Sequence, residues 1–141
     1  MPFSNFDRDD VWSSFLDEGI DLVVVLTEKQ EYLVYAQKDL PEFYRSQGLD
    51  VLHVPVPDFG IPDDLTGWDE GIKQAAGAAR DGDNVVIHCL AGIGRTGTFL
   101  ACLAKEDLGL EGSDAIRWVR KTLPGAMENK YQEEFVIQHG R

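Results

Sequence analysis

Three short apolar runs alternate along the chain with longer stretches in which apolar residues recur at helical spacing. The runs lie within residues 20–26, 51–56 and 84–88, and the first contains five consecutive aliphatic residues, from Leu22 to Leu26. An uninterrupted run of this kind is typical of a strand that is covered on both faces in a parallel sheet. The pattern therefore predicts three buried strands.

Six helical segments are predicted before, between and after these strands. They follow Asp9 and Asp10 as far as Gly19, span 31–47 with a break near Pro41, begin at about Leu65 and Arg95, and follow the caps Ser113 and Asn129. The stretch 99–104 is apolar on every side, which predicts a central, buried helix. Helices between strands imply parallel pairing. The predicted fold class is α/β, with three layers and a small, mostly parallel central sheet flanked by helices.

Length and composition narrow the classes of protein further. The chain has 141 residues and only two cysteines, and it has neither an apolar run of 18 residues nor a recognisable export signal at its start. These features predict one domain over residues 1–141 that works as a monomer in the reducing cytoplasm. The net charge of −12 argues against nucleic acid and anionic membranes as partners.

The segment after the third predicted strand carries the strongest candidate chemistry. Its sequence is His88-Cys89-Leu90-Ala91-Gly92-Ile93-Gly94-Arg95-Thr96-Gly97. The backbone N–H groups of residues 90–95, followed by a helix N-terminus, can form a nest that binds an anion. An arginine side chain adds a planar fork that can grip two phosphate oxygens. Because a cation and a helix N-terminus favour the thiolate form of cysteine, Cys89 is predicted to be a nucleophile beneath a phosphate-sized cradle.

This loop resembles the signature loop of the cysteine-based protein tyrosine and dual-specificity phosphatases, through His88, Cys89, Arg95 and Thr96. Residues 56–62, Val-Pro-Asp-Phe-Gly-Ile-Pro, resemble the movable acid loop of the same family, with valine where tryptophan is usual. Residues 128–132 resemble the family's glutamine loop, with Asn129 where threonine is usual. The likeness extends from about residue 20 to residue 132 and implies a small phosphatase of this family and its fold.

The resemblance also implies a role for each matching residue. Cys89 attacks phosphorus, while Arg95 and the amides of residues 90–94 (Leu90, Ala91, Gly92, Ile93 and Gly94) stabilise the transferring group. Asp58 protonates the leaving oxygen, and Thr96 hydrogen-bonds the sulfur. Gln132 positions the hydrolytic water. His88 orients the loop and is not expected to act as a base.

Several of these residues have simpler interpretations. Asp58 is also consistent with a solvated turn, and the nearby Asp63 and Asp64 suit the cap of the helix that follows. Asn129 and Gln132 have the spacing of a capping box. Cys102 lies about two helical turns beyond the loop and is expected to be a core residue.

The sequence therefore predicts a phosphomonoester hydrolase that forms a cysteinyl-phosphate and needs no metal or cofactor. Phosphoproteins or phosphopeptides are the expected partners, with a shallow site that tolerates phosphotyrosine and phosphoserine or phosphothreonine. A phosphoinositide or an RNA 5′-phosphate is an alternative substrate, although residues 90, 91 and 93 carry no charge. A phosphopeptide-binding module without activity is a second alternative, although cysteine, arginine and aspartate are all present.

Overall fold

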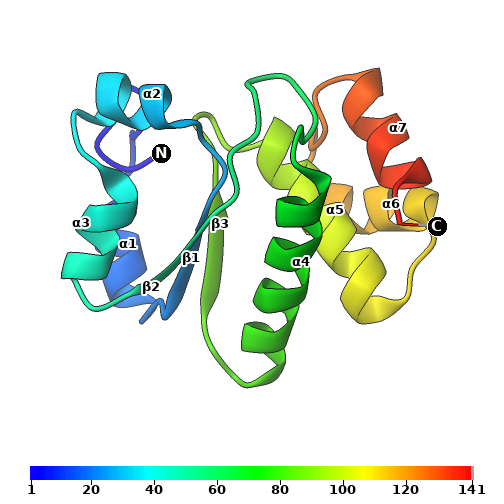
Figure 1. Ribbon diagram of the computed structural model, residues 1–141, viewed down its shortest axis with the longest axis horizontal. Coiled ribbons are helices and arrows are strands. Elements are labelled where there is room, and N and C mark those ends of the chain that lie inside the picture. The colour runs from blue at the N-terminus through cyan, green and yellow to red at the C-terminus, as the bar shows by residue number, and fades with distance from the viewer. Residues whose placement is uncertain (141) are drawn as a thin grey trace.

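The computed structural model describes residues 1–140, and at its centre lie three parallel strands (Figure 1). These are β1 (Leu22–Val25), β2 (Asp50–His53) and β3 (Val85–His88), in the order β2-β1-β3. Val25 pairs in register with both His53 and His88, so the three strands end at the same edge of the sheet. The predicted parallel pairing is confirmed.

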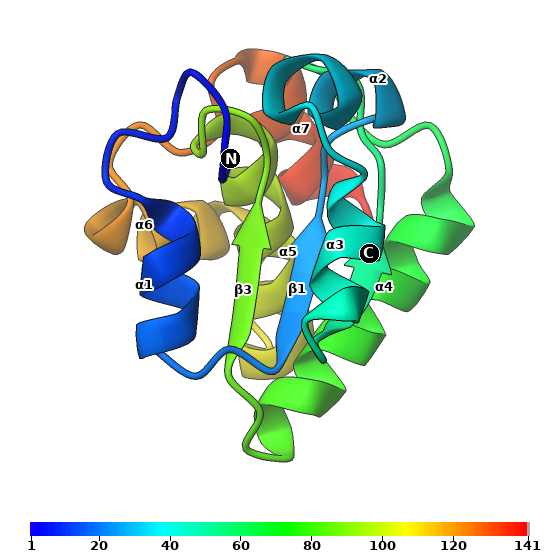
Figure 2. The same cartoon turned by 90° about the vertical axis from the view of Figure 1, so that its left-hand side faces the viewer.

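One face of the sheet is covered by the first part of the chain. It carries α1 (Val11–Asp17), the short α2 (Lys29–Glu31), the π-helix η1 (Tyr32–Ala36) and α3 (Leu40–Ser46), with α1 and α3 facing the viewer in Figure 2. The buried core on this face consists of Met1, Phe15, Val23, Val25, Tyr32, Ala36, Leu40, Tyr44 and Leu90.

The opposite face is covered by the longer helices. These are α4 (Leu65–Arg80), α5 (Gly94–Leu108), α6 (Gly112–Thr122) and α7 (Lys130–Gln138). Helix α5 packs against α4, α6, α7 and β3, which confirms its predicted central position (Figure 1). Val24 and Leu26 belong to the core on this side, whereas their neighbours in β1 belong to the other core. The alternation follows from the two-residue period of a strand, and it confirms the three-layer α/β fold.

Strands β1 and β2 end earlier than the apolar runs predict, at Val25 and His53. Beyond β2, the backbone N–H groups of Val54 and Val56 still donate to Val25 and Leu26, at 2.9 and 3.0 Å. These two hydrogen bonds hold residues 54–56, which lead into the next loop, beside the end of β1.

The predicted helix break near Pro41 is present but displaced by a few residues, and the predicted start of the helix capped by Ser113 is wrong. The break in 31–47 lies at residues 37–39, where Gln37 has a φ of 54° and Asp39 caps α3, and Pro41 is part of the first turn. A proline is tolerated there because its missing N–H would have no partner in the helix. The N-cap of α6 is Glu111, and Ser113 lies inside the helix. No helix within residues 1–140 is long and apolar enough to span a membrane.

Candidate active site

Cys89 follows the last residue of β3, and the loop that begins with it leads directly into α5. Gly92 has a φ of 97°, a conformation that glycine adopts without strain. A side chain at Gly94 would overlap the carboxylate of Glu128, which comes from the segment before α7. Glycine is therefore required for different reasons at the two positions: Gly92 allows the backbone turn, and Gly94 leaves room for Glu128.

The sulfur of Cys89 is buried at this edge of the sheet. The Thr96 hydroxyl donates a hydrogen bond to it at 3.2 Å, as the resemblance implied. The cavity that contains Cys89 has a volume of about 130 Å³ and is lined by Phe6, Asp58, Phe59, Cys89, Leu90, Ala91, Gly92, Gly94, Arg95 and Glu128. The predicted nucleophile, acid and cation therefore share one small cavity.

Arg95 is 2% exposed and its guanidinium is held by groups from several loops. Its two terminal nitrogens donate to the two carboxylate oxygens of Glu31 at 2.7 and 2.8 Å, and one also donates to the Val56 carbonyl at 2.9 Å. Asp58 forms an ion pair with it at 3.1 Å. Burial lowers the pKa of Arg95, but hydrogen bonding to Glu31 and the charges of Glu31, Cys89 and Asp58 outweigh burial and raise it.

Glu31 is a site residue that the sequence analysis missed. It ends α2, just beyond β1, and its two-point contact sets the plane of the Arg95 guanidinium. The sequence offered one signal for Glu31: it follows β1 closely, and β1 ends at the same edge of the parallel sheet as its neighbour β3. Nothing in the spacing identified this carboxylate among the many of an acidic chain.

The acid loop, residues 56–62, contributes Asp58 and Phe59 to the lining of the cavity. Its middle is held by two side chains of the segment that begins α7: Asn129 Nδ2 donates to the Phe59 carbonyl at 2.8 Å, and Gln132 Nε2 donates to the Gly60 carbonyl at 3.2 Å. Within the loop, Phe59 has a φ of 60° and its N–H donates to the Asp58 carboxylate. These contacts direct Asp58, whose side chain is 44% exposed, toward Arg95.

Gln132 is completely buried, and both ends of its side-chain amide have partners. Its oxygen accepts from the Glu128 N–H at 2.8 Å, while its nitrogen reaches Gly60. Asn129 caps α7 as predicted, by accepting from the Gln132 N–H at 3.0 Å. The Gln132 side chain accepts from the N–H of Glu128, and not from that of Asn129 as in a capping box, and it connects α7 to the acid loop at Gly60.

Glu128 lines the cavity and is a second carboxylate that the sequence analysis did not single out as a site residue. Burial raises the pKa of its carboxyl, the negative charge of Asp58 raises it further, and Arg95 acts in the opposite direction. Asp58 is therefore not the only carboxyl group that faces the cavity.

His88 lies beneath the loop and has hydrogen-bond partners at both ring nitrogens. Nδ1 lies 3.1 Å from the Cys89 carbonyl and Nε2 lies 2.9 Å from the Tyr44 hydroxyl. Burial lowers the pKa of His88 to about 4. Because a carbonyl only accepts, the neutral ring donates from Nδ1 and accepts from Tyr44. These contacts suit the orienting role predicted for His88.

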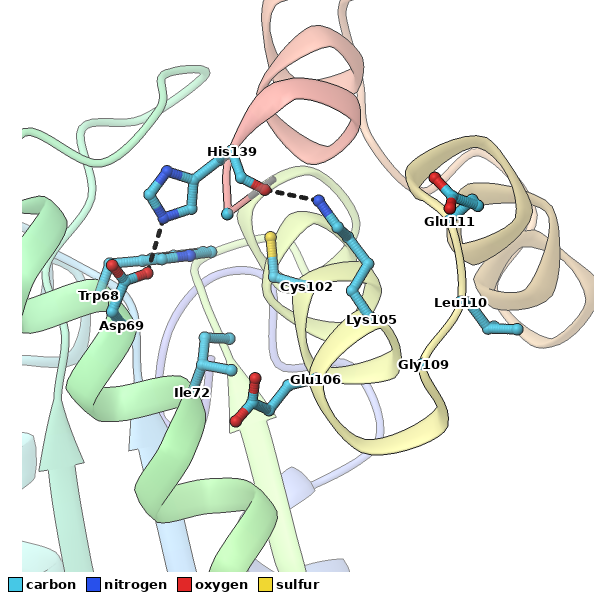
Figure 3. Close-up of a pocket in the computed structure, with 11 residues that line it drawn as sticks. Trp68, Asp69, Ile72, Cys102, Lys105, Glu106, Gly109, Leu110, Glu111 and His139 are labelled. Carbon is cyan, nitrogen blue, oxygen red and sulfur yellow. Dashed lines mark hydrogen bonds and ion pairs between the residues drawn. The ribbon is translucent and has the colours of Figure 1, made fainter.

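A second cavity, of about 380 Å³, lies between α4, α5 and the end of α7 (Figure 3). Cys102 lines it, and burial raises the pKa of this thiol to about 12. Lys105 donates to the Val136 and His139 carbonyls, and His139 pairs with Asp69 at 2.6 Å. These polar contacts hold the C-terminal helix in place. Among residues 1–140, no group of three or more histidine, cysteine or acidic side chains could hold a metal ion.

Comparison with known proteins agrees with this geometry. A family model described as a DSP-PTPase phosphatase of polymorphic toxin systems (Tc-R-P) matches residues 4–106, and the chain belongs to this phosphatase family. Among characterised relatives, cyclin-dependent kinase inhibitor 3 of Rattus norvegicus is 33% identical over 85 residues, which are 60% of this chain and 40% of that protein. The chain thus spans less than half the length of this relative.

Solved structures show the same fold. Tk-PTP in its active form is 35% identical, with a TM-score of 0.72 over 86% of this chain and 80% of that one. PTPMT1 in complex with PI(5)P is 22% identical, with a TM-score of 0.71 over 96% of this chain and 86% of that one. At 22% identity the second likeness shows the fold alone.

Proposed function

We propose that the protein hydrolyses phosphomonoesters of polypeptides, phosphotyrosine above all, through a cysteinyl-phosphate intermediate. The observation that carries this proposal is the shared cavity of Cys89, Arg95 and Asp58. A nucleophile, a fixed cation and a carboxylic acid within one cavity are the groups that phosphoryl transfer to a thiol requires.

In the first step the Cys89 thiolate attacks phosphorus. An S–P bond forms, the bond from phosphorus to the ester oxygen breaks, and Asp58 gives its proton to that departing oxygen. Arg95 and the backbone N–H groups of the loop stabilise the charge on the equatorial phosphate oxygens. For a phosphate to reach Arg95, it has to take over the ion pair that Asp58 makes in the free protein.

In the second step water attacks phosphorus and gives a proton to the Asp58 carboxylate. The S–P bond breaks and the thiolate leaves, with its charge stabilised by the hydrogen bond from Thr96. Gln132 acts in this scheme by holding the acid loop, through Gly60, rather than by holding the water. The reaction requires a free thiol, and we therefore place it in the reducing cytoplasm, where the protein works as a monomer.

A phosphoinositide is the second candidate substrate, because PTPMT1, a protein with the same fold, has been solved in complex with PI(5)P. The phosphate loop is less suited to such a substrate, because Leu90, Ala91 and Ile93 carry no charge that could bind a further headgroup phosphate. The net charge of −12 also opposes approach to an anionic membrane.

The test is hydrolysis of para-nitrophenyl phosphate, phosphopeptides and a short-chain phosphoinositide, each with and without a chelator. We expect chelator-insensitive hydrolysis of the aryl phosphate, and a higher kcat/KM for a phosphotyrosine peptide than for the phosphoinositide. The reverse order would reassign the protein to lipid substrates. Binding of phosphopeptides without any turnover would identify it as a binding module.

A further inference from the structure

Exposed apolar side chains adjoin the mouth of the Cys89 cavity. Phe6 lines the cavity and is 50% exposed, and its ring lies edge-on against Tyr35, with 6.5 Å between the ring centroids. Tyr35 and the two residues before it on η1, Leu33 and Val34, are exposed by 42%, 43% and 65%. Phe6, Leu33, Val34 and Tyr35 are here called the apolar strip.

Only the two ends of η1 are packed into the core of the protein. Tyr32 and Ala36, at the two ends of η1, are almost fully buried and attach the π-helix to the core. Between them, three consecutive large apolar residues face solvent. Adjoining apolar residues on the surface of a charged protein are typical of an interaction site, and π-helical turns are frequent at functional sites.

The apolar strip is also attached to the catalytic machinery. Helix η1 begins immediately after Glu31, whose carboxylate holds Arg95 at two points. Figure 2 shows α2 and the N-terminal segment together at the end of the sheet where the strands terminate. The strip therefore adjoins the cavity through Phe6, which lines the cavity and contacts Tyr35.

We propose that the apolar strip binds apolar side chains of the polypeptide that flank the phosphorylated residue. A residue whose phosphate occupies the cavity lies beside Phe6, which lines that cavity, and the ring of Tyr35 lies 6.5 Å beyond the ring of Phe6. Because an extended chain rises about 3.3 Å per residue, a residue about two positions from the phosphorylated one is placed near Tyr35. An anionic membrane is a poorer occupant because the chain has a net charge of −12. This inference rests on the proposed function, since it specifies the substrate of the same site.

The test uses two phosphotyrosine peptides that differ only in having leucine or serine two residues on either side of the phosphotyrosine. For the natural sequence we expect a KM that is about fivefold lower for the leucine peptide. The double variant Val34→Ser/Tyr35→Ser should lose this preference, while its kcat/KM for para-nitrophenyl phosphate stays within about twofold. The matched control is Trp118→Ser on α6, which removes an aromatic side chain of similar exposure, 48%, and should keep the preference.

Each other outcome overturns a specific statement. Equal KM values for the two peptides, with both hydrolysed, would refute the apolar strip and leave the phosphatase intact. Absence of hydrolysis of every phosphate ester would refute the proposed function itself. Loss of activity on vesicles of phosphatidylcholine and phosphatidylinositol 5-phosphate in the double variant, with the peptide preference retained, would assign the strip to a membrane. If the double variant loses activity on para-nitrophenyl phosphate, the milder variant Val34→Thr is tested in its place. An unchanged preference of Val34→Thr for the leucine peptide would refute the proposal.

Discussion

The two cysteines of the chain are both buried beside α5, yet their chemical surroundings differ. Cys89 precedes the helix and shares its cavity with Arg95, and it accepts a hydrogen bond from Thr96. Cys102 lies within the helix, where the backbone N–H groups are already paired, and burial raises its pKa to about 12. Because both thiols are buried, burial alone does not distinguish them, and we propose that its position beside Arg95 at the N-terminus of α5 makes Cys89 the nucleophile.

The largest effect on activity is expected when Cys89 is replaced. Cys89→Ser should lower hydrolysis of para-nitrophenyl phosphate by about 10³-fold or more, because a serine hydroxyl without a base is a poor nucleophile. Binding of inorganic phosphate, measured by calorimetry, should remain because the loop amides and Arg95 are unchanged. Residual activity within about tenfold of the natural protein would contradict the covalent mechanism.

Arg95→Lys tests whether the cation beside Cys89 acts by its charge or by its shape. Lysine keeps the charge but cannot make the two-point contact with Glu31 while it also reaches Val56. We expect kcat to fall by about 10²-fold or more and phosphate affinity to fall as well. Glu31→Gln is the companion variant, and it should lower kcat less, because a neutral amide still accepts one hydrogen bond. Normal steady-state constants for Arg95→Lys would show that Arg95 only supports the helix.

The identity of the acid is tested by Asp58→Asn against Glu128→Gln, since both carboxyl groups line the Cys89 cavity. A positioned acid contributes about 10²–10⁴ in rate. Asp58→Asn should therefore slow a phosphotyrosine peptide far more than an aryl phosphate with a highly acidic phenol, and flatten the alkaline limb of the pH–rate profile. Glu128→Gln should leave both features in place. The opposite result would make Glu128 the proton donor.

The hydrogen bond between the acid loop and the start of α7 is tested at Asn129. Asn129→Asp keeps the oxygen that caps α7 but removes the amide that donates to Phe59. We expect stability to change little and kcat for the phosphotyrosine peptide to fall by several-fold, about the effect of one lost hydrogen bond. Asn129→Ala removes both the cap of α7 and the hydrogen bond to Phe59. Comparing the thermal unfolding of the two variants therefore separates an effect on the loop from loss of the cap. If Asn129→Asp and the natural protein have the same kcat, the loop does not need this contact.

The smallest effect is expected at Cys102. Cys102→Ala should leave kcat and KM unchanged and cost about 1 kcal/mol of unfolding free energy, measured with urea, because it leaves a small void in the core. Between pH 6 and 9 the Cys102 thiol stays protonated, since its pKa of about 12 lies well above this range. Iodoacetamide should therefore modify Cys89 first in the folded protein, as mass spectrometry of the labelled peptides would show. Equal labelling of both thiols would remove the contrast.

Local sequence patterns were sufficient for much of the molecule. The loop from His88 to Thr96 is contiguous, so its strand, glycines, nucleophile and arginine could all be recognised together. The apolar runs likewise predicted the parallel sheet and the central helix, because burial on both faces leaves a continuous signal. The break near Pro41 was displaced by a few residues and the cap at Ser113 was wrong, because the first turn of a helix tolerates several residue types and neighbouring segments decide where it begins.

The contacts that position the catalytic groups join residues far apart in the chain. Glu31 holds Arg95, and Asn129 and Gln132 hold the backbone of the acid loop. A hydrogen bond between distant residues leaves no periodic trace in a single sequence, and an acidic chain offers many candidate carboxylates. The order of residues thus determined the fold class and predicted a candidate nucleophile, whereas only the tertiary structure decided which carboxylates and amides contact the arginine and the acid loop.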